Sequence, residues 1–89
     1  MEDRSFSIYS ERYAGMKGEI RNGCLHIESD VYGDDYDSEA HYTLAEAETE
    51  RLFSIISPDD FIALCREGHV KGMLDLFETN NIDYSSYVF

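Results

Sequence analysis

The chain has 89 residues, of which 43% are hydrophobic and 29% charged, a length and composition that suit one folded domain spanning residues 1–89 rather than a disordered acidic segment. Its 19 acidic residues against 7 Lys and Arg give a formal net charge of -12, which repels phosphate backbones and anionic membrane surfaces. We therefore expect neither direct nucleic-acid binding nor membrane binding, and the charge favours a basic protein as partner.

The first half of the chain has the alternating pattern of strands. Phe6 and Ile8 alternate with polar residues and predict a short first strand. In "MKGEIRNGCLHIES", Asn22-Gly23 predicts a two-residue type I′ turn, because both turn positions need positive φ. The register that follows pairs Arg21 with Cys24, Ile20 with Leu25, Glu19 with His26, Gly18 with Ile27, and Lys17 with Glu28. One face of this hairpin is then apolar (Met16, Ile20, Leu25, Ile27) and the other polar (Lys17, Glu19, Arg21, His26, Glu28).

A second hairpin is expected after Tyr32, with a turn at "GDD", residues 33–35, and a returning strand through "YDSEAHYT". The same alternation places the following residues inside: Val31, Tyr36, Ala40 and Tyr42. It places these outside: Glu28, Asp30, Asp37, Glu39 and His41. The acidic residues thus converge on one exposed face.

The second half of the chain has helical periodicity. Thr43 and Glu46 resemble a capping box ahead of an apolar stripe formed by Ala45, Thr49, Leu52, Phe53 and Ile56, which predicts a helix ending near Ser57. Ser57 as N-cap and Pro58 at the first helical position predict a second helix, which Gly68 is placed to end. A further helical stripe of Val70, Met73, Leu74 and Phe77 is closed by Asn80-Asn81.

The tail "IDYSSYVF" is rich in β-branched and aromatic residues and predicts a final strand that returns to the sheet. The chain is therefore expected to be α+β, with an antiparallel β-sheet of about four to five strands and two to three helices packed on one face. The order along the chain is strands, helices, strand.

The best candidate for function is the acidic, tyrosine-rich region around "VYGDDYDSEAHY". Like charges opposite each other on a sheet are destabilising, and a basic partner relieves that cost. Tyrosine offers a large contact area with few rotatable bonds. The predicted partner-binding residues are Glu28, Asp30, Tyr32, Asp34, Asp35, Tyr36, Asp37 and Glu39. A merely solvated sheet edge is the alternative.

The same region also contains potential metal ligands. "DVYGDDYDSE" does not match an EF-hand loop, which argues against calcium. His26 and His41 lie near Glu28 and Glu39 on the outer face if the second hairpin forms, and such a group suits zinc or another transition metal. Because that placement depends on the hairpin, we expect no metal and no cofactor.

Catalysis is not indicated. Cys65 and His69 are spaced as a nucleophile and base on one helical face, but Gly68 interrupts that face and Cys65 belongs to an apolar stripe with Phe61 and Leu64. Phosphate-binding glycine loops and nucleophile elbows are absent from the sequence. We expect no enzyme and no catalytic residue.

The cysteines and the N-terminus indicate the compartment. Two cysteines, Cys24 and Cys65, are too few for a disulfide framework, and "MEDRSFSIYS" lacks the apolar core of a signal peptide. A soluble protein of the cytoplasm is expected.

The segment "LFSIISPDDFIALCREGHVKGMLDLFETNNIDY", residues 52–84, resembles bacterial toxin-immunity proteins, in particular those paired with contact-dependent growth-inhibition toxins. The resemblance implies a non-enzymatic inhibitor that covers a basic nuclease toxin with complementary acidic charge, and it carries over no individual site residue. Two alternatives stay open: a nucleic-acid mimic that inhibits a host or defence nuclease, of the anti-restriction or anti-CRISPR type, and a small metal-dependent enzyme using His26, His41 and nearby carboxylates.

Overall fold

The computed structural model describes residues 2–8, 15–32 and 37–88, with the backbone alone described at 30–32 and 37–38. Its elements are β1 (Arg4–Ile8), β2 (Met16–Arg21), β3 (Cys24–Tyr32), β4 (Asp37–Leu44), α1 (Glu46–Ile55), α2 (Pro58–Thr79) and β5 (Ser85–Val88). The predicted order of strands, helices and a final strand is therefore confirmed.

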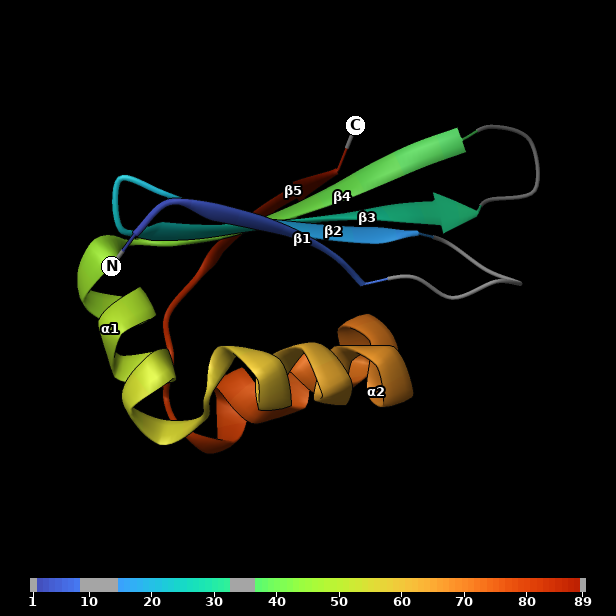
Figure 1. Ribbon diagram of the computed structural model, residues 1–89. Coiled ribbons are helices and arrows are strands. Elements are labelled where there is room, and N and C mark those ends of the chain that lie inside the picture. The colour runs from blue at the N-terminus through green and yellow to red at the C-terminus, as the bar shows by residue number, and fades with distance from the viewer. Residues whose placement is uncertain (1, 9–14, 33–36, 89) are drawn as a thin grey trace.

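The strands form a five-stranded antiparallel sheet in the order β1-β2-β3-β4-β5. After the two helices, β5 returns to the sheet and pairs with β4 (Figure 1). The α+β class and the antiparallel sheet are as predicted, with five strands and two helices. The C-terminal strand pairs with β4 of its own chain, as the pattern of the tail predicts.

The β2-β3 hairpin has the predicted register. Arg21 pairs with Cys24 and Lys17 with Glu28. Asn22 and Gly23 adopt φ values of 54° and 81°, as the two central positions of a type I′ turn require. The inner face of this hairpin is buried, including Ile20, Leu25 and Ile27.

The second hairpin, β3-β4, also forms. Ile27 pairs with Tyr42, Glu28 with His41 and Asp30 with Glu39. Ala40 is buried, as predicted, and Tyr42 packs against the core. The expected turn at "GDD" and the inward placement of Tyr36 lie outside the described residues, and so does the inward placement of the Val31 side chain.

Helix α1 begins differently from the prediction. Its N-cap is Ala45, whose side chain cannot accept a hydrogen bond, and the capping box of Thr43 and Glu46 is absent. Thr43 instead belongs to β4, where its hydroxyl contacts the Nδ1 atom of His26 at 2.9 Å. Pairing of β4 with β3 therefore places Thr43 in the sheet, where it cannot cap the helix.

Helix α2 begins as predicted, with the Ser57 hydroxyl accepting a hydrogen bond from the backbone N–H of Asp60 at 3.1 Å and Pro58 in the first turn. The helical backbone is interrupted one residue after Gly68, at His69, which adopts φ 55° and ψ -152° and joins two helical segments across a kink in α2. The predicted break is therefore present, displaced by one residue. Asn80 caps the helix, close to the predicted end.

The core lies between the sheet and the helices, which in Figure 1 both lie below the sheet. The inner residues of β2 and β3 and the apolar stripes of α1 and α2 form one buried cluster, to which the helices contribute Leu52, Phe61, Met73 and Phe77. Among the described residues, no helix combines the length and the hydropathy needed to cross a membrane.

Candidate functional site on the outer face of the sheet

The outer face of the sheet brings together polar side chains from three neighbouring strands. Because side chains alternate along a strand, His26 and Glu28 of β3 share this face with Glu39 and His41 of β4. Tyr87 of β5 stands opposite His41. This group is called the outer-face cluster below, and it comprises His26, Glu28, Glu39, His41, Thr43 and Tyr87.

The structure places the predicted partner-binding residues as follows. Glu28 and Glu39 lie on the outer face, as predicted, and Glu39 exposes 47% of its side chain. The register sets Asp30 directly opposite Glu39 and Tyr32 opposite Asp37. Asp34, Asp35 and Tyr36 lie outside the described residues. The expected juxtaposition of acidic positions on β3 and β4 is therefore present at one directly opposed pair, Asp30 with Glu39, whereas Glu28 stands opposite His41.

A chain of ring contacts runs across the outer-face cluster. The Nδ1 atom of His26 lies 2.9 Å from the Thr43 hydroxyl, and its Nε2 atom lies 3.1 Å from Nδ1 of His41. The Nε2 atom of His41 lies 3.3 Å from a carboxylate oxygen of Glu39. An ionised carboxylate only accepts, so His41 donates from Nε2 and accepts at Nδ1 from His26. In the tautomers that satisfy these contacts, His26 in turn accepts at Nδ1 from the Thr43 hydroxyl.

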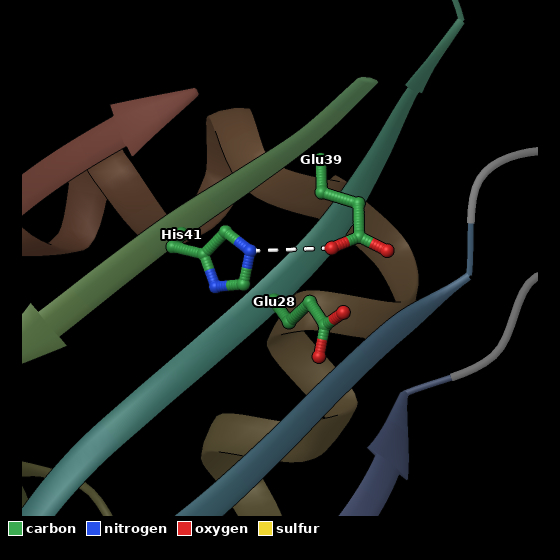
Figure 2. A group of neighbouring side chains, drawn as sticks. All are labelled: Glu28, Glu39 and His41. Atoms are coloured by element: carbon green, nitrogen blue, oxygen red, sulfur yellow. Dashed lines mark hydrogen bonds and ion pairs between the residues drawn. The ribbon is translucent and has the colours of Figure 1, made fainter. Parts of the chain in front are cut away.

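Three members of the cluster converge as potential metal ligands. One ligand atom each from Glu28, Glu39 and His41 lies within 4.8 Å of the other two (Figure 2). The convergence follows from the register, because Glu28 stands directly opposite His41 and Glu39 is two residues from His41 on the same face of β4. Sequence reasoning named these residues and placed them correctly.

The burial of His41 is what sequence reasoning missed. An outward-facing histidine on a sheet is expected to be exposed, yet His41 is only 8% exposed. The ring of Tyr87 stacks on it with centroids 4.7 Å apart and planes 1° from parallel, and His26 covers another side. No signal in the sequence sets Tyr87 opposite His41, because that pairing joins residues on either side of two helices.

A shallow groove of about 430 Å³ adjoins the cluster on the side of β1 and β2. Ser5, Ser7 and Lys17 line it together with His26 and Glu28 of the cluster. The groove is polar and open, so it suits contact with a polar surface more than enclosure of a small apolar ligand.

Cys65 packs in the core, as expected, and is fully buried. Burial raises the pKa of its thiol from 9.0 to about 12, so the thiolate that a nucleophile needs is scarce near neutral pH. His69 is exposed at the kink of α2. Cys24 is partly exposed, and both cysteines are free thiols.

Comparison of the chain with protein-family models, with curated proteins and with solved structures finds no match. The resemblance to toxin-immunity proteins accordingly stays a prediction.

Proposed function

We propose that this protein is a non-enzymatic inhibitor that binds a basic protein through the outer face of its sheet, and that its partner is a toxin nuclease, which makes it an immunity protein. The observation that supports the proposal most directly is the register of β3 and β4, which sets Asp30 opposite Glu39. Like charges at directly opposite positions cost stability in the free protein. A basic partner compensates that cost on binding.

The arrangement of layers supports the same surface. We infer that both helices pack on one face of the sheet, because inner-face strand residues such as Ile20 and Leu25 share a single buried cluster with Phe61 and Phe77 of α2. The opposite face is then left to the polar residues of β2, β3 and β4. A large polar sheet face is a surface on which a partner can dock without unfolding anything.

Aromatic anchors are the second element of the proposal. Tyr32 stands opposite Asp37 at the end of the hairpin, next to the acidic positions. Tyr87 adds an aromatic residue that sequence reasoning did not include, and it remains 49% exposed while stacked on His41. A rigid ring that is held in place before binding, as Tyr87 is, loses little entropy in an interface.

The charge also fits the proposed partner. A formal charge of -12 on 89 residues accelerates association with a basic protein and repels nucleic acid, the substrate of the toxin. The inhibitor would act in the cytoplasm, where free thiols such as those of Cys24 and Cys65 persist.

The test is co-expression with the C-terminal domain encoded by the gene immediately upstream. We expect this protein to restore growth and to bind the purified domain in calorimetry, with an affinity that falls as salt rises. Replacing Asp34, Asp35 and Asp37 together by Lys should raise the dissociation constant about tenfold or more, mainly by slowing association.

A matched control reverses three acids on α2 instead. Glu67, Asp75 and Glu78 are exposed there, and their triple Lys variant has the same net charge as the variant at Asp34, Asp35 and Asp37. It should bind nearly as well as the parent. The proposal is wrong if the chain neither protects nor binds, or if both triple variants lose affinity equally. Inhibition of a restriction or CRISPR nuclease in place of the neighbouring toxin would identify a nucleic-acid mimic.

A further inference from the structure

We propose that Glu28, Glu39 and His41 form a binding site for a divalent transition-metal ion of the Zn²⁺ class on the outer face of the sheet. The site shares Glu28 and Glu39 with the surface proposed above to bind a partner, but it rests on the geometry of the three ligands and needs no partner. Two carboxylates and one imidazole are a ligand set that zinc and its neighbours accept, and three protein ligands leave a coordination position open for water or another group.

The spacing of the donor atoms fits one ion. Two ligands at about 2.0 Å from a tetrahedral metal are separated by about 3.3 Å. The Nε2 atom of His41 and the Glu39 carboxylate oxygen lie 3.3 Å apart. Glu28 completes the group, with all three ligand atoms within 4.8 Å of one another. Figure 2 shows the two carboxylates and the imidazole approaching one another from adjacent strands. Small rotations of the two glutamates are enough to bring all three onto one ion.

The imidazole of His41 is held in place before any ion arrives. Its side chain is 9% exposed, and the parallel ring of Tyr87 fixes its plane. Locking a ligand by packing reduces the entropy lost on coordination. Rotation of the two glutamate side chains would bring their oxygens to an ion held at the fixed imidazole of His41.

Outer contacts of the kind that metal-bound histidines use are also present. A ligating histidine almost always donates its second ring N–H to a neighbouring acceptor. With Nε2 of His41 on the ion, its Nδ1–H donates to Nε2 of His26 at 3.1 Å. His26 then donates from Nδ1 to the Thr43 hydroxyl at 2.9 Å. Both rings change tautomer on binding and neither changes its number of protons.

The local charge favours a dication. Glu28 and Glu39 bring two negative charges to the site, and the register adds Asp30 opposite Glu39. A divalent cation neutralises the two ligating carboxylates and relieves repulsion that the folded chain otherwise bears. Mg²⁺ and Ca²⁺ prefer all-oxygen sites, so the buried imidazole selects a transition metal over them.

The experiment is calorimetric titration of the full-length chain, stripped of metal with a chelator, with Zn²⁺ alone, and in parallel with Mg²⁺. We expect one saturable Zn²⁺ site and no comparable heat with Mg²⁺. Glu39→Gln and Glu28→Gln should each lower Zn²⁺ affinity about tenfold or more, because each keeps the shape of the side chain but replaces an anionic ligand with a neutral amide. Glu19→Gln is the matched control, since Glu19 lies on β2, on the same outer face of the sheet, and its carboxylate accepts a hydrogen bond from Arg21.

The ring nitrogens give a second measurement that depends on the bound ion. ¹⁵N spectra of His41 should show the proton on Nε2 without Zn²⁺ and on Nδ1 with it, while circular dichroism shows that the Gln variants remain folded. The proposal is overturned if no stoichiometric Zn²⁺ binding is found, or if Glu19→Gln weakens binding as much as Glu39→Gln. It is also overturned if the His41 ring keeps its proton on Nε2 at saturation. None of these outcomes bears on the toxin partner, whose test changes no metal ligand.

Discussion

Thr49 provides the sharpest test of how the first helix is attached to the sheet. Its side chain is fully buried, and its hydroxyl accepts a hydrogen bond from the backbone N–H of Leu25 at 3.0 Å. The same hydroxyl donates to the carbonyl of Ala45 at 3.0 Å, one turn earlier in the chain. Thr49 thus supplies a side-chain acceptor for the N–H of Leu25, which lies in the sheet between β2 and β4. Thr49→Val keeps the shape of the side chain and removes that acceptor.

The expected loss of unfolding free energy in Thr49→Val follows from the burial of the Thr49 side chain and of Leu25. Leu25 is 0% exposed, so in the valine variant its N–H has no water to replace the hydroxyl. A buried donor left without an acceptor costs about 1–3 kcal/mol. Thr49→Ser keeps the hydroxyl and loses one buried methyl group, which costs about 1 kcal/mol. At about 4–8 °C per kcal/mol for a domain of this size, the valine variant should melt about 5–20 °C lower than the parent.

Urea denaturation measures the change in unfolding free energy, and amide hydrogen exchange locates it. The Leu25 amide should exchange faster in Thr49→Val and stay protected in Thr49→Ser, although the serine variant also loses stability. If the valine variant matched the parent within about 0.5 kcal/mol and its Leu25 amide stayed protected, the bond from α1 to β3 would not contribute as argued.

Three further predictions concern stability and reactivity. Arg51 pairs with Glu48 at 2.8 Å and donates to two backbone carbonyls at the C-terminal end of α2. Arg51→Ala should therefore lower the free energy of unfolding by about 1 kcal/mol in thermal denaturation. Arg51→Lys should stay closer to the parent because it keeps the charge. Gly23 has φ 81°, so Gly23→Ala should lower the free energy of unfolding by about 1–2 kcal/mol. A Cβ at Gly68 meets nothing within 4 Å, so Gly68→Ala should leave stability equal or higher. Equal losses of stability in the two variants would refute the turn argument. The raised pKa of Cys65, about 12 in the folded chain, means that the unfolded state loses its thiol proton first as pH rises above 9, so stability should fall by about 1 kcal/mol near pH 10. The Cys65→Ala variant should lack this loss of stability at high pH. Iodoacetamide at pH 8 should label the partly exposed Cys24 well before Cys65 in the parent, and equal labelling rates would contradict the burial of Cys65.

Several local features could be predicted because neighbouring residues alone decide them. Asn22-Gly23 sets the turn and, with a two-residue loop, the whole β2-β3 register, because a shift of one residue would expose Ile20 and Leu25. Ser57-Pro58 sets the start of α2 in the same local way. The capping pattern at Thr43 failed for the opposite reason, since pairing of β4 with β3 recruits that residue into the sheet.

In the candidate site, too, some features follow from neighbouring residues and others from the packing of distant segments. The sequence by itself determined the charge of the chain and, through the hairpin alternation, which face Glu28, Glu39 and His41 share. Only the tertiary structure decided that His41 is buried and fixed, because Tyr87 reaches it after a connection through both helices. The partner of the Leu25 N–H is likewise a side chain from α1. Alternation and turn chemistry act over a few residues, whereas these contacts depend on where distant segments pack, and no local pattern encodes that position.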